Sequence, residues 1–432
     1  MSRLRHHRTI GRRTFLTLAT GVAAGFANQS MRSSPVVAQN SKHTVTIWCH
    51  FAGTNYEIFQ RYVTAFNQAT PDVEIKSVSY GPSEILPKYL AAVAAGAPPD
   101  IFHAPGYVPP DFAHNGVIIP LDEKVKLDPT TLKNFDPITI YDGQRYGVPV
   151  NGGLGAMCYN LELFEKAGLD TRNLPETWDD LIASAEKISH LGDNQWGLML
   201  GNQPGLPTAQ VYWTFLICAG GDLVTPDGKA SAFNSEAGLT TLSFLADAVN
   251  KLQISPRKAY SDVQAWSEWG TNKIGSVLLY PVFTANILAT KIRSATAPSL
   301  KKVQRGAHFA GNYWTISSAS KNQEAAAKFC QWWAQPSISG RWAGESGGIP
   351  NSQAAIDDPG FKAFLAKNPL GQAFLDAIPF ARPFPGVIGL PAIIQITSEM
   401  VQAAVLGGEP PKAALSKAAA RVDSELKRAQ KG

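Results

Sequence analysis

The sequence lacks the short motifs that mark several large enzyme classes. It contains neither G-x-x-x-x-G-K-[ST] nor G-x-G-x-x-G, which excludes the phosphate-loop and dinucleotide-binding classes. Its eight histidines form neither H-E-x-x-H nor an H-x-H pair, so the sequence predicts no metal site and no cofactor. A ligand-binding function and a hydrolytic function without a metal both stay open.

Cysteine is scarce, and none of its positions forms a C-x-x-C motif. Each cysteine lies inside an apolar segment such as "TIWCHF", a pattern that favours buried free thiols. A disulfide in an exported protein stays open, although the sequence does not choose a pairing. The four residues are Cys49, Cys158, Cys218 and Cys330.

Acidic residues are absent from the first 38 positions, which hold six arginines and no lysine. Without these positions the chain has 33 basic and 34 acidic residues, a net charge of −1 instead of +5. The basic character therefore belongs to a leader, and the remainder offers no basic surface for nucleic acid or an anionic membrane.

The leader has the three parts of a signal peptide. The basic "MSRLRHHRTIGRR" precedes the apolar "FLTLATGVAAGFA", and small residues at Val36 and Ala38 suit cleavage after Ala38, with Ala27 as the alternative. Arg12 and Arg13 followed by "TFL" resemble the twin-arginine motif. We therefore expect residues 1–38 to direct export through the twin-arginine pathway. A basic N-terminus that arose by chance is the alternative. No later run reaches 18 apolar residues and no cysteine follows the leader, so we expect a soluble mature chain without a lipid anchor.

Strands and helices alternate along the first part of the remaining chain. The segments "TVTIWCHF", "VEIKSVSY" and "DIFHAPG" have strand character, and helical periodicity separates them. This alternation predicts βαβ units and a doubly wound parallel sheet, which binds ligands at the carboxyl ends of its strands. We therefore expect ligand contacts in the loops "CHFAGTN", "SYGPSE" and "FHAPGYVPP".

A second α/β pattern follows the stretch "DGQRYGVPVNGGLGAMCYN", which ends at residue 160. It contains a helix in "LPETWDDLIASAEKIS", a strand in "NQWGLML", a helix in "SEAGLTTLSFLADAVNKL" and a buried strand in "KIGSVLLYPVF". A further strand, "GNYWTISSAS", and two helical stretches complete the chain. The order indicates two α/β lobes between which the chain passes several times.

The stretch "GESGGIP" matches the G-x-S-x-G pattern of esterases. A nucleophile elbow needs a strand before the serine and a helix after it, but here a Trp-rich helix precedes Ser346 and Pro350 follows. The glycines suit a bending connection or a backbone that faces a ligand. We therefore do not expect Ser346 to be a nucleophile.

Aromatic residues gather at predicted strand ends and in loops, where an aromatic face can stack on the C–H face of a sugar. Core packing accounts for at least half of them. A satisfied or solvated side chain is the simplest interpretation of His50, His103 and His308, but the first two lie where the ligand loops are predicted and are therefore candidate polar contacts. The aromatic candidates are Trp48, Tyr80, Tyr107, Trp213, Trp266, Trp269, Tyr280, Phe283, Tyr313 and Trp314.

Several segments resemble the extracellular solute-binding proteins of ABC importers, family 1, which include maltose- and glycerol-phosphate-binding members. The resemblance runs from about residue 43 to 428 and rests above all on "YNLELFEKAGLD" followed by "LPETWDDL". It implies a two-lobed periplasmic-binding-protein type II fold of the α/β class. Each lobe would have a mostly parallel sheet flanked by helices. Three hinge crossings would lie near 150–152, 310–312 and 347–350.

The resemblance also implies domain boundaries and site residues. Residues 43–150 and 311–347 would form the N-terminal lobe, and 151–310 and 348–430 the C-terminal lobe. Ser346 and Gly347 fall at the third crossing, and Arg382 lies just before the glycine-rich "PFPGVIGLPA", which has no basic residue of its own. The expected ligand contacts are His50, Gly53, Tyr80, Ser83, His103, Tyr107, Asn151, Gly152, Trp213, Trp266, Tyr280, Phe283, Gly311, Asn312, Ser346, Gly347 and Arg382.

Because glycerol-phosphate binders have an arginine in that glycine-rich loop, its absence favours a neutral sugar, oligosaccharide or polyol. The resemblance implies a monomeric, non-enzymatic periplasmic receptor that closes on its ligand and delivers it to an ABC permease. A secreted carbohydrate-active enzyme is an alternative, and it would need two carboxylates roughly 5–10 Å apart. Binding of a glycerol-phosphate-type ligand and binding of a metal ion are further alternatives.

Overall fold

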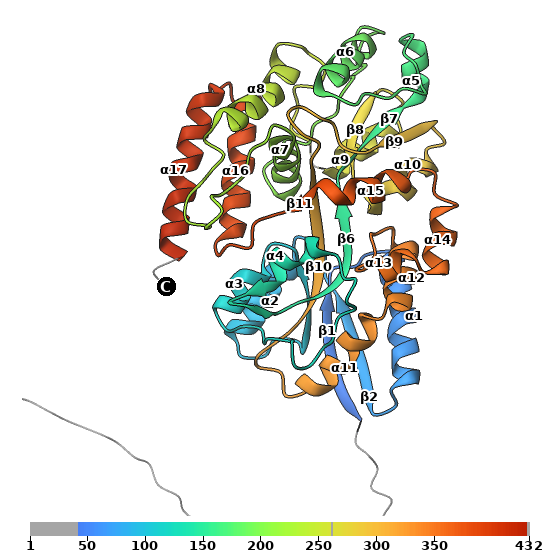
Figure 1. Ribbon diagram of the computed structural model, residues 1–432, viewed down its shortest axis with the longest axis vertical. Coiled ribbons are helices and arrows are strands. Elements are labelled where there is room, and N and C mark those ends of the chain that lie inside the picture. The colour runs from blue at the N-terminus through green and yellow to red at the C-terminus, as the bar shows by residue number, and fades with distance from the viewer. Residues whose placement is uncertain (1–41, 261, 430–432) are drawn as a thin grey trace, which may run out of the picture. The chain divides into compact units, whose positions relative to one another are not determined.

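The computed structural model describes residues 42–260 and 262–429, which form one compact unit (Figure 1). The expected signal peptide, residues 1–38, lies outside the described residues. Within the described part, no helix has the length and apolarity needed to cross a membrane.

A six-stranded sheet organises one lobe, which we call the large-sheet lobe. Its strand order is β11-β10-β3-β1-β2, and β6 also pairs with β10. β1 is parallel to β2 and β3, as the βαβ pattern predicts, but β10 is antiparallel to both β3 and β6. The sheet is therefore mixed. Its strands are β1 (His43–Cys49), β2 (Val73–Ser79), β3 (Ile101–Pro105), β6 (Val148–Leu154), β10 (Ala307–Ile316) and β11 (Ala381–Pro383).

Aromatic packing holds the helices of this lobe to the sheet. α1 (Thr54–Ala69) buries Phe59, whose ring lies 5.5 Å from that of Trp314 on β10. Trp333 and Trp342, also fully buried, extend the cluster from α11 and α12. The other helices around this sheet are α2 (Ile85–Ala94), α3 (Pro109–His114), α4 (Asp136–Thr139), α11 (Gln323–Trp333), α12 (Pro336–Ser346), α13 (Gln353–Ile356) and α14 (Pro359–Leu365). The short elements η1 (Lys133–Phe135), β4 (Ile140–Tyr141) and β5 (Gln144–Arg145) lie between them in sequence.

A three-stranded sheet organises the second lobe, which we call the small-sheet lobe. Its order is β8 (Ser276–Leu279), β7 (Ala156–Asn160) and β9 (Ser294–Ala297). Both pairings are antiparallel, so the prediction of a mostly parallel sheet is wrong for this lobe. The predicted strand "NQWGLML" contributes only isolated parallel bridges at Trp196 and Met199. Strand spacing could not fix these directions because the connections are long enough to return the chain either way.

Helices surround the small sheet, and one of them lies at the centre of the lobe. α7 (Leu206–Cys218) has no charged residue and packs against α8, α16 and β10, which explains why it is apolar almost all round. The remaining helices are α5 (Leu161–Lys166), α6 (Trp178–Ser189), α8 (Glu236–Asn250), α9 (Asp262–Trp269), α10 (Thr284–Ala289), α15 (Gln372–Ala377), α16 (Leu390–Val405) and α17 (Pro411–Ala429). The 3-10 turns η2 (Pro281–Phe283) and η3 (Ile378–Phe380) complete the lobe.

The three segments that the sequence predicts as crossings lie side by side. β6 and β10 run between the two lobes in Figure 1, and Gly152 on β6 is opposite Gly311 on β10. On its other side Gly152 exchanges two backbone hydrogen bonds with Ile349, at 2.8 and 2.7 Å. Beyond this segment, α13 and α14 pack on α12. A narrow bundle of backbone therefore connects the lobes beside the cavity described next.

Candidate functional site

A cavity of about 620 Å³ lies at the junction of the two lobes. The loops after β1 and β3 and the turn before α2 supply His50, Tyr107 and Ser83, as the strand-end argument predicts. The connecting strands add Asn151 from β6 and Asn312 from β10, whose side-chain amides lie 3.5 Å apart. We call these five side chains the polar wall.

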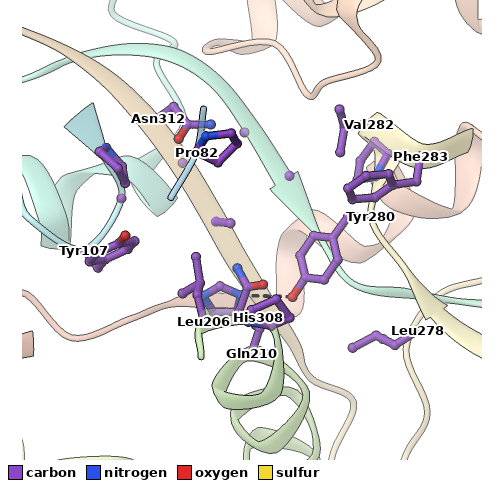
Figure 2. Close-up of a pocket in the computed structure, with 18 of the residues that line it drawn as sticks. Pro82, Tyr107, Leu206, Gln210, Leu278, Tyr280, Val282, Phe283, His308 and Asn312 are labelled. Carbon is purple, nitrogen blue, oxygen red and sulfur yellow. Dashed lines mark hydrogen bonds between the residues drawn. The ribbon is translucent and has the colours of Figure 1, made fainter. Parts of the chain in front are cut away.

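The opposite side of the cavity belongs to the small-sheet lobe and is mainly aliphatic. Leu206 and Val211 come from α7, Leu278 from β8, and Val282 and Phe283 from η2. Figure 2 shows Asn312 and Tyr107 on one side of the cavity and Leu278, Val282 and Phe283 on the other. We call these five residues the apolar wall. Of its members, the sequence predicted only Phe283.

The cavity contains ten of the seventeen predicted contacts, so the sequence located the region but not all of its walls. These ten are His50, Ser83, Tyr107, Asn151, Gly152, Tyr280, Phe283, Gly311, Asn312 and Gly347. Gly347 adopts φ 75° as the C-cap of α12, a conformation that suits glycine.

Two of the predicted contacts from the small-sheet lobe lie in different surroundings. Trp213 is only 3% exposed and packs in the core, where its Nε1 donates to the Pro383 carbonyl at 3.2 Å. Arg382 lies over the Trp213 ring and pairs with Asp222 at 2.8 Å. Neither residue lines the cavity, because each is already engaged elsewhere.

Four predicted residues of the large-sheet lobe also lie outside the cavity wall. Gly53, at φ 52°, caps the start of α1, and the ring of Tyr80 packs edge-on against Trp48. His103 is fully buried behind His50, and Ser346 is a buried residue at the end of α12. The side chain of Trp266, a further predicted contact, lies outside the described residues.

Two histidines, the partly buried His50 and the fully buried His103, form a stack at the edge of the polar wall. The rings of His50 and His103 are 4.1 Å apart and nearly parallel, at 12°. Burial lowers the pKa of His50 to about 4, although its hydrogen bonds to the His103 backbone and the Asn312 side chain oppose that shift. Burial also lowers the pKa of His103 well below its ordinary value, with repulsion from His50 as the second cause. Both rings are therefore neutral at pH 7.

A third buried histidine, His308, lies beside the apolar wall, and the sequence analysis did not select it. Its Nδ1 lies 3.1 Å from the Tyr280 hydroxyl, and its ring contacts Phe384. Burial lowers its pKa to about 3, so this ring is also neutral. Its Nε2 is buried without a hydrogen-bond partner among the described residues, which leaves it available to a ligand. Its position two residues before the predicted crossing at 310–312 was the one signal that could have identified it.

No lining residue in the described part of the chain is Asp, Glu, Lys or Arg. The wall therefore offers neutral amides, hydroxyls and imidazoles, together with the backbone of several glycines. Such a site cannot neutralise a phosphate, and it provides no pair of carboxylates for glycosidic hydrolysis.

Metal ligation and thiol chemistry find no support in the described residues. They contain no group of three His, Cys, Asp or Glu residues arranged to hold a metal ion. All four cysteines are buried and free, which confirms the expectation of free thiols. Burial raises the pKa of the Cys49 thiol to about 12, so this thiol stays protonated at neutral pH.

Comparisons with known proteins agree with this architecture. A putative binding protein of Brucella abortus (strain 2308) is 27% identical over 418 residues, covering 94% of this chain and 98% of the relative. A solute-binding protein from Thermotoga lettingae, solved with α-D-tagatose, matches with a TM-score of 0.80 at 27% identity, over 89% of this chain and 100% of that one. UgpB from Mycobacterium tuberculosis, solved with glycerophosphocholine, shares the fold at a TM-score of 0.80 and 19% identity, over 90% of this chain and 99% of that one.

These matches confirm the predicted two-lobed fold. The profile of the bacterial extracellular solute-binding proteins matches residues 52–338, which is more than half of the chain. The chain therefore belongs to the bacterial extracellular solute-binding protein family.

Proposed function

We propose that this protein is the receptor of an ABC importer and binds a neutral sugar, oligosaccharide or polyol in the cavity between its lobes. The observation that carries the proposal is the wall without charged side chains. Neutral histidines, asparagines and a serine can donate to and accept from hydroxyl groups without neutralising a charge.

A phosphorylated ligand fits this wall poorly. Burying an anion without a cationic partner costs far more than burying a hydroxyl that finds a hydrogen bond. Arg382, the basic residue that the sequence analysis named as a ligand contact, forms an ion pair with Asp222 and does not line the cavity. This arrangement favours a neutral solute over a glycerol-phosphate-type ligand.

The connecting backbone suits a closing motion. Gly152, Gly311 and Ile349 lie in three adjacent segments, and hinges are typically a few such residues that absorb changes in φ and ψ. We propose that the large-sheet lobe moves against the small-sheet lobe, with α13 and α14, which pack on α12, on the large-sheet side of the boundary expected at residue 348. A ligand that contacts both walls binds the closed state better and shifts the equilibrium toward it.

The remaining steps follow from the same role. Export through the twin-arginine leader would bring a folded monomer to the periplasm, where the closed form would dock on the permease. Binding without turnover follows from the wall, which presents no carboxylate in the described residues. A secreted glycosidase would need a pair of carboxylates there.

Titration of the purified mature protein with sugars tests the proposal. Calorimetry and thermal shift would compare D-tagatose, maltose and D-glucose with D-glucose 6-phosphate and glycerol 3-phosphate. We expect saturable 1:1 binding of a neutral member, a raised unfolding midpoint, and an unchanged ligand after prolonged incubation. A phosphate that binds as tightly as its neutral counterpart, or a hydrolysed product, would contradict the proposal.

A further inference from the structure

The two walls differ in what they can offer to a polyhydroxylated molecule. Ligand hydroxyl groups that face the polar wall can hydrogen-bond to an imidazole, amides and hydroxyls. These bonds replace the hydrogen bonds to water that the ligand loses on binding. Hydroxyl groups that face Leu206, Val211 or Leu278 lose water and find only aliphatic carbon. A ligand with hydroxyl groups on every side would therefore fit one wall and not the other.

The apolar wall also differs from an aromatic sugar platform. Four of its five members are aliphatic, and aliphatic side chains present no π face to the C–H groups of a sugar ring. Trp213 is buried in the core, and two further aromatic residues on this side, Tyr280 and Phe384, lie beside the aliphatic members of the wall and contact His308. The four aliphatic side chains therefore suit a hydrocarbon substituent, whereas a sugar ring can stack only on the neighbouring aromatic residues.

Several side chains of the apolar wall are at least partly exposed to solvent, so the wall is an accessible surface and not only buried core. Val282 is 40% exposed, and Leu206 and Val211 are partly exposed. The nearest polar groups are the Gln210 amide, the Tyr280 hydroxyl and the buried Nε2 of His308, which lie near the α7 end of the wall (Figure 2). Apolar surface that faces a cavity gains free energy when a ligand removes it from water.

We infer that the ligand is amphiphilic: a neutral glycoside or polyol whose hydroxyl groups bind the polar wall and whose uncharged hydrocarbon substituent packs on the apolar wall. This inference rests on the proposed function and narrows its ligand class. It assigns Leu206 and Val282 the role of selecting for the substituent.

Matched pairs of glycosides provide the test. Affinities of the mature protein would be measured by calorimetry for the methyl and phenyl forms of β-D-glucoside, β-D-galactoside, α-D-mannoside and β-D-xyloside. In at least one series we expect the phenyl form to bind roughly ten-fold or more tightly than the methyl form, since it buries more hydrocarbon.

Variants of the wall make the test specific. Leu206→Asn and Val282→Thr keep similar shapes but replace apolar atoms with polar ones. Together they should reduce the phenyl-to-methyl ratio to within about two-fold of unity, because phenyl affinity falls more than methyl affinity when the apolar contact is lost. Val303→Thr, a matched change at a 67% exposed position outside the cavity, should leave the ratio unchanged.

Each outcome decides the inference. A ratio that falls in the wall variants but not in Val303→Thr supports it. A ratio near unity in the unmodified protein, with methyl glycosides bound, overturns the inference and leaves the proposed function standing. A high ratio that survives both wall substitutions also overturns it, because the phenyl group would then bind elsewhere. Failure of every methyl and phenyl glycoside to bind, while a neutral sugar of the earlier panel binds, overturns the inference alone, whereas failure of that panel as well overturns the proposed function.

Discussion

The two walls line the same cavity but are built from different structural elements. The polar wall stands at the ends of strands and on connecting strands, where side chains such as Asn151 and Asn312 project beside glycine backbone. The apolar wall is the surface of α7, β8 and η2, continuous with the core of the small-sheet lobe. The comparison shows that one wall of a binding site can consist of side chains at strand ends, while the opposite wall is a continuation of the hydrophobic core.

Histidine shows what the walls share. His50 and His103 lie on the side of the polar wall and His308 beside the apolar wall, and burial keeps all three neutral. Protonation of any of these three imidazoles in the folded protein would therefore lower the free energy of unfolding.

The largest effect that we predict is a loss of stability as the pH falls. The folded pKa values of these histidines lie below the ordinary 6.5, so between pH 6.5 and about 4 the unfolded chain binds protons that the folded chain excludes. The free energy of unfolding is thus highest above pH 6.5 and decreases below it. Each histidine contributes up to about 1.4 kcal/mol per pH unit. Urea denaturation at pH 7, 6 and 5 would measure the slope.

His308→Gln separates the contributions of the two walls. Because this variant removes one of the three buried imidazoles, we expect the difference in slope from the parent to be about one third of the histidine contribution. Carboxylates that titrate near pH 4–5 affect both proteins equally and cancel in the comparison. An identical slope in parent and variant would show that His308 does not resist protonation.

The sequence predicted the polar wall better than the apolar wall for a physical reason. Strand ends are recognisable from local pattern, and parallel strands bring their carboxyl ends to one edge, which placed His50, Ser83 and Tyr107 together. The resemblance supplied Asn151 and Asn312. The direction of each side chain was not predictable in the same way, since His103 lies in the middle of β3 and is fully buried.

The apolar wall has no comparable local signal. Leu206 and Val211 on α7 follow the same pattern as core residues, and only tertiary packing determines which helix face meets the cavity. Trp213 shows the reverse error, because an aromatic residue suited to a sugar lies on the face that packs inward. The antiparallel small sheet escaped prediction for a related reason, since strand periodicity contains no information on pairing direction.

A substitution at Gly106 should disturb the backbone beside the polar wall and destabilise the protein. A Cβ at this position would lie 2.2 Å from the Gly311 carbonyl oxygen, and two backbone segments would have to separate. We expect Gly106→Ala to lower the free energy of unfolding by about 2–3 kcal/mol, as overpacking commonly does. Chemical denaturation of the unliganded protein would measure the loss.

Gly153→Ala is the matched control for Gly106→Ala. Its added Cβ would meet Tyr280 and Pro281 at 3.7 and 3.8 Å, which is ordinary contact distance. We expect stability to stay unchanged or to rise by up to about 1 kcal/mol, since alanine restricts the unfolded chain. Equal losses in the two variants would mean that close backbone approach is not what requires glycine at position 106.

The smallest effect concerns the hydroxyl that holds His308 beside the apolar wall. Tyr280→Phe removes the oxygen 3.1 Å from His308 Nδ1 and should cost about 1 kcal/mol of stability, because a buried nitrogen is left without a partner. Tyr141→Phe removes an equivalent contact to His114 Nδ1, 2.8 Å long, at a partly exposed site where water can replace the hydroxyl. Its cost should be clearly smaller. If the two variants lost equal stability by chemical denaturation, burial beside the apolar wall would not explain the strength of the Tyr280 contact.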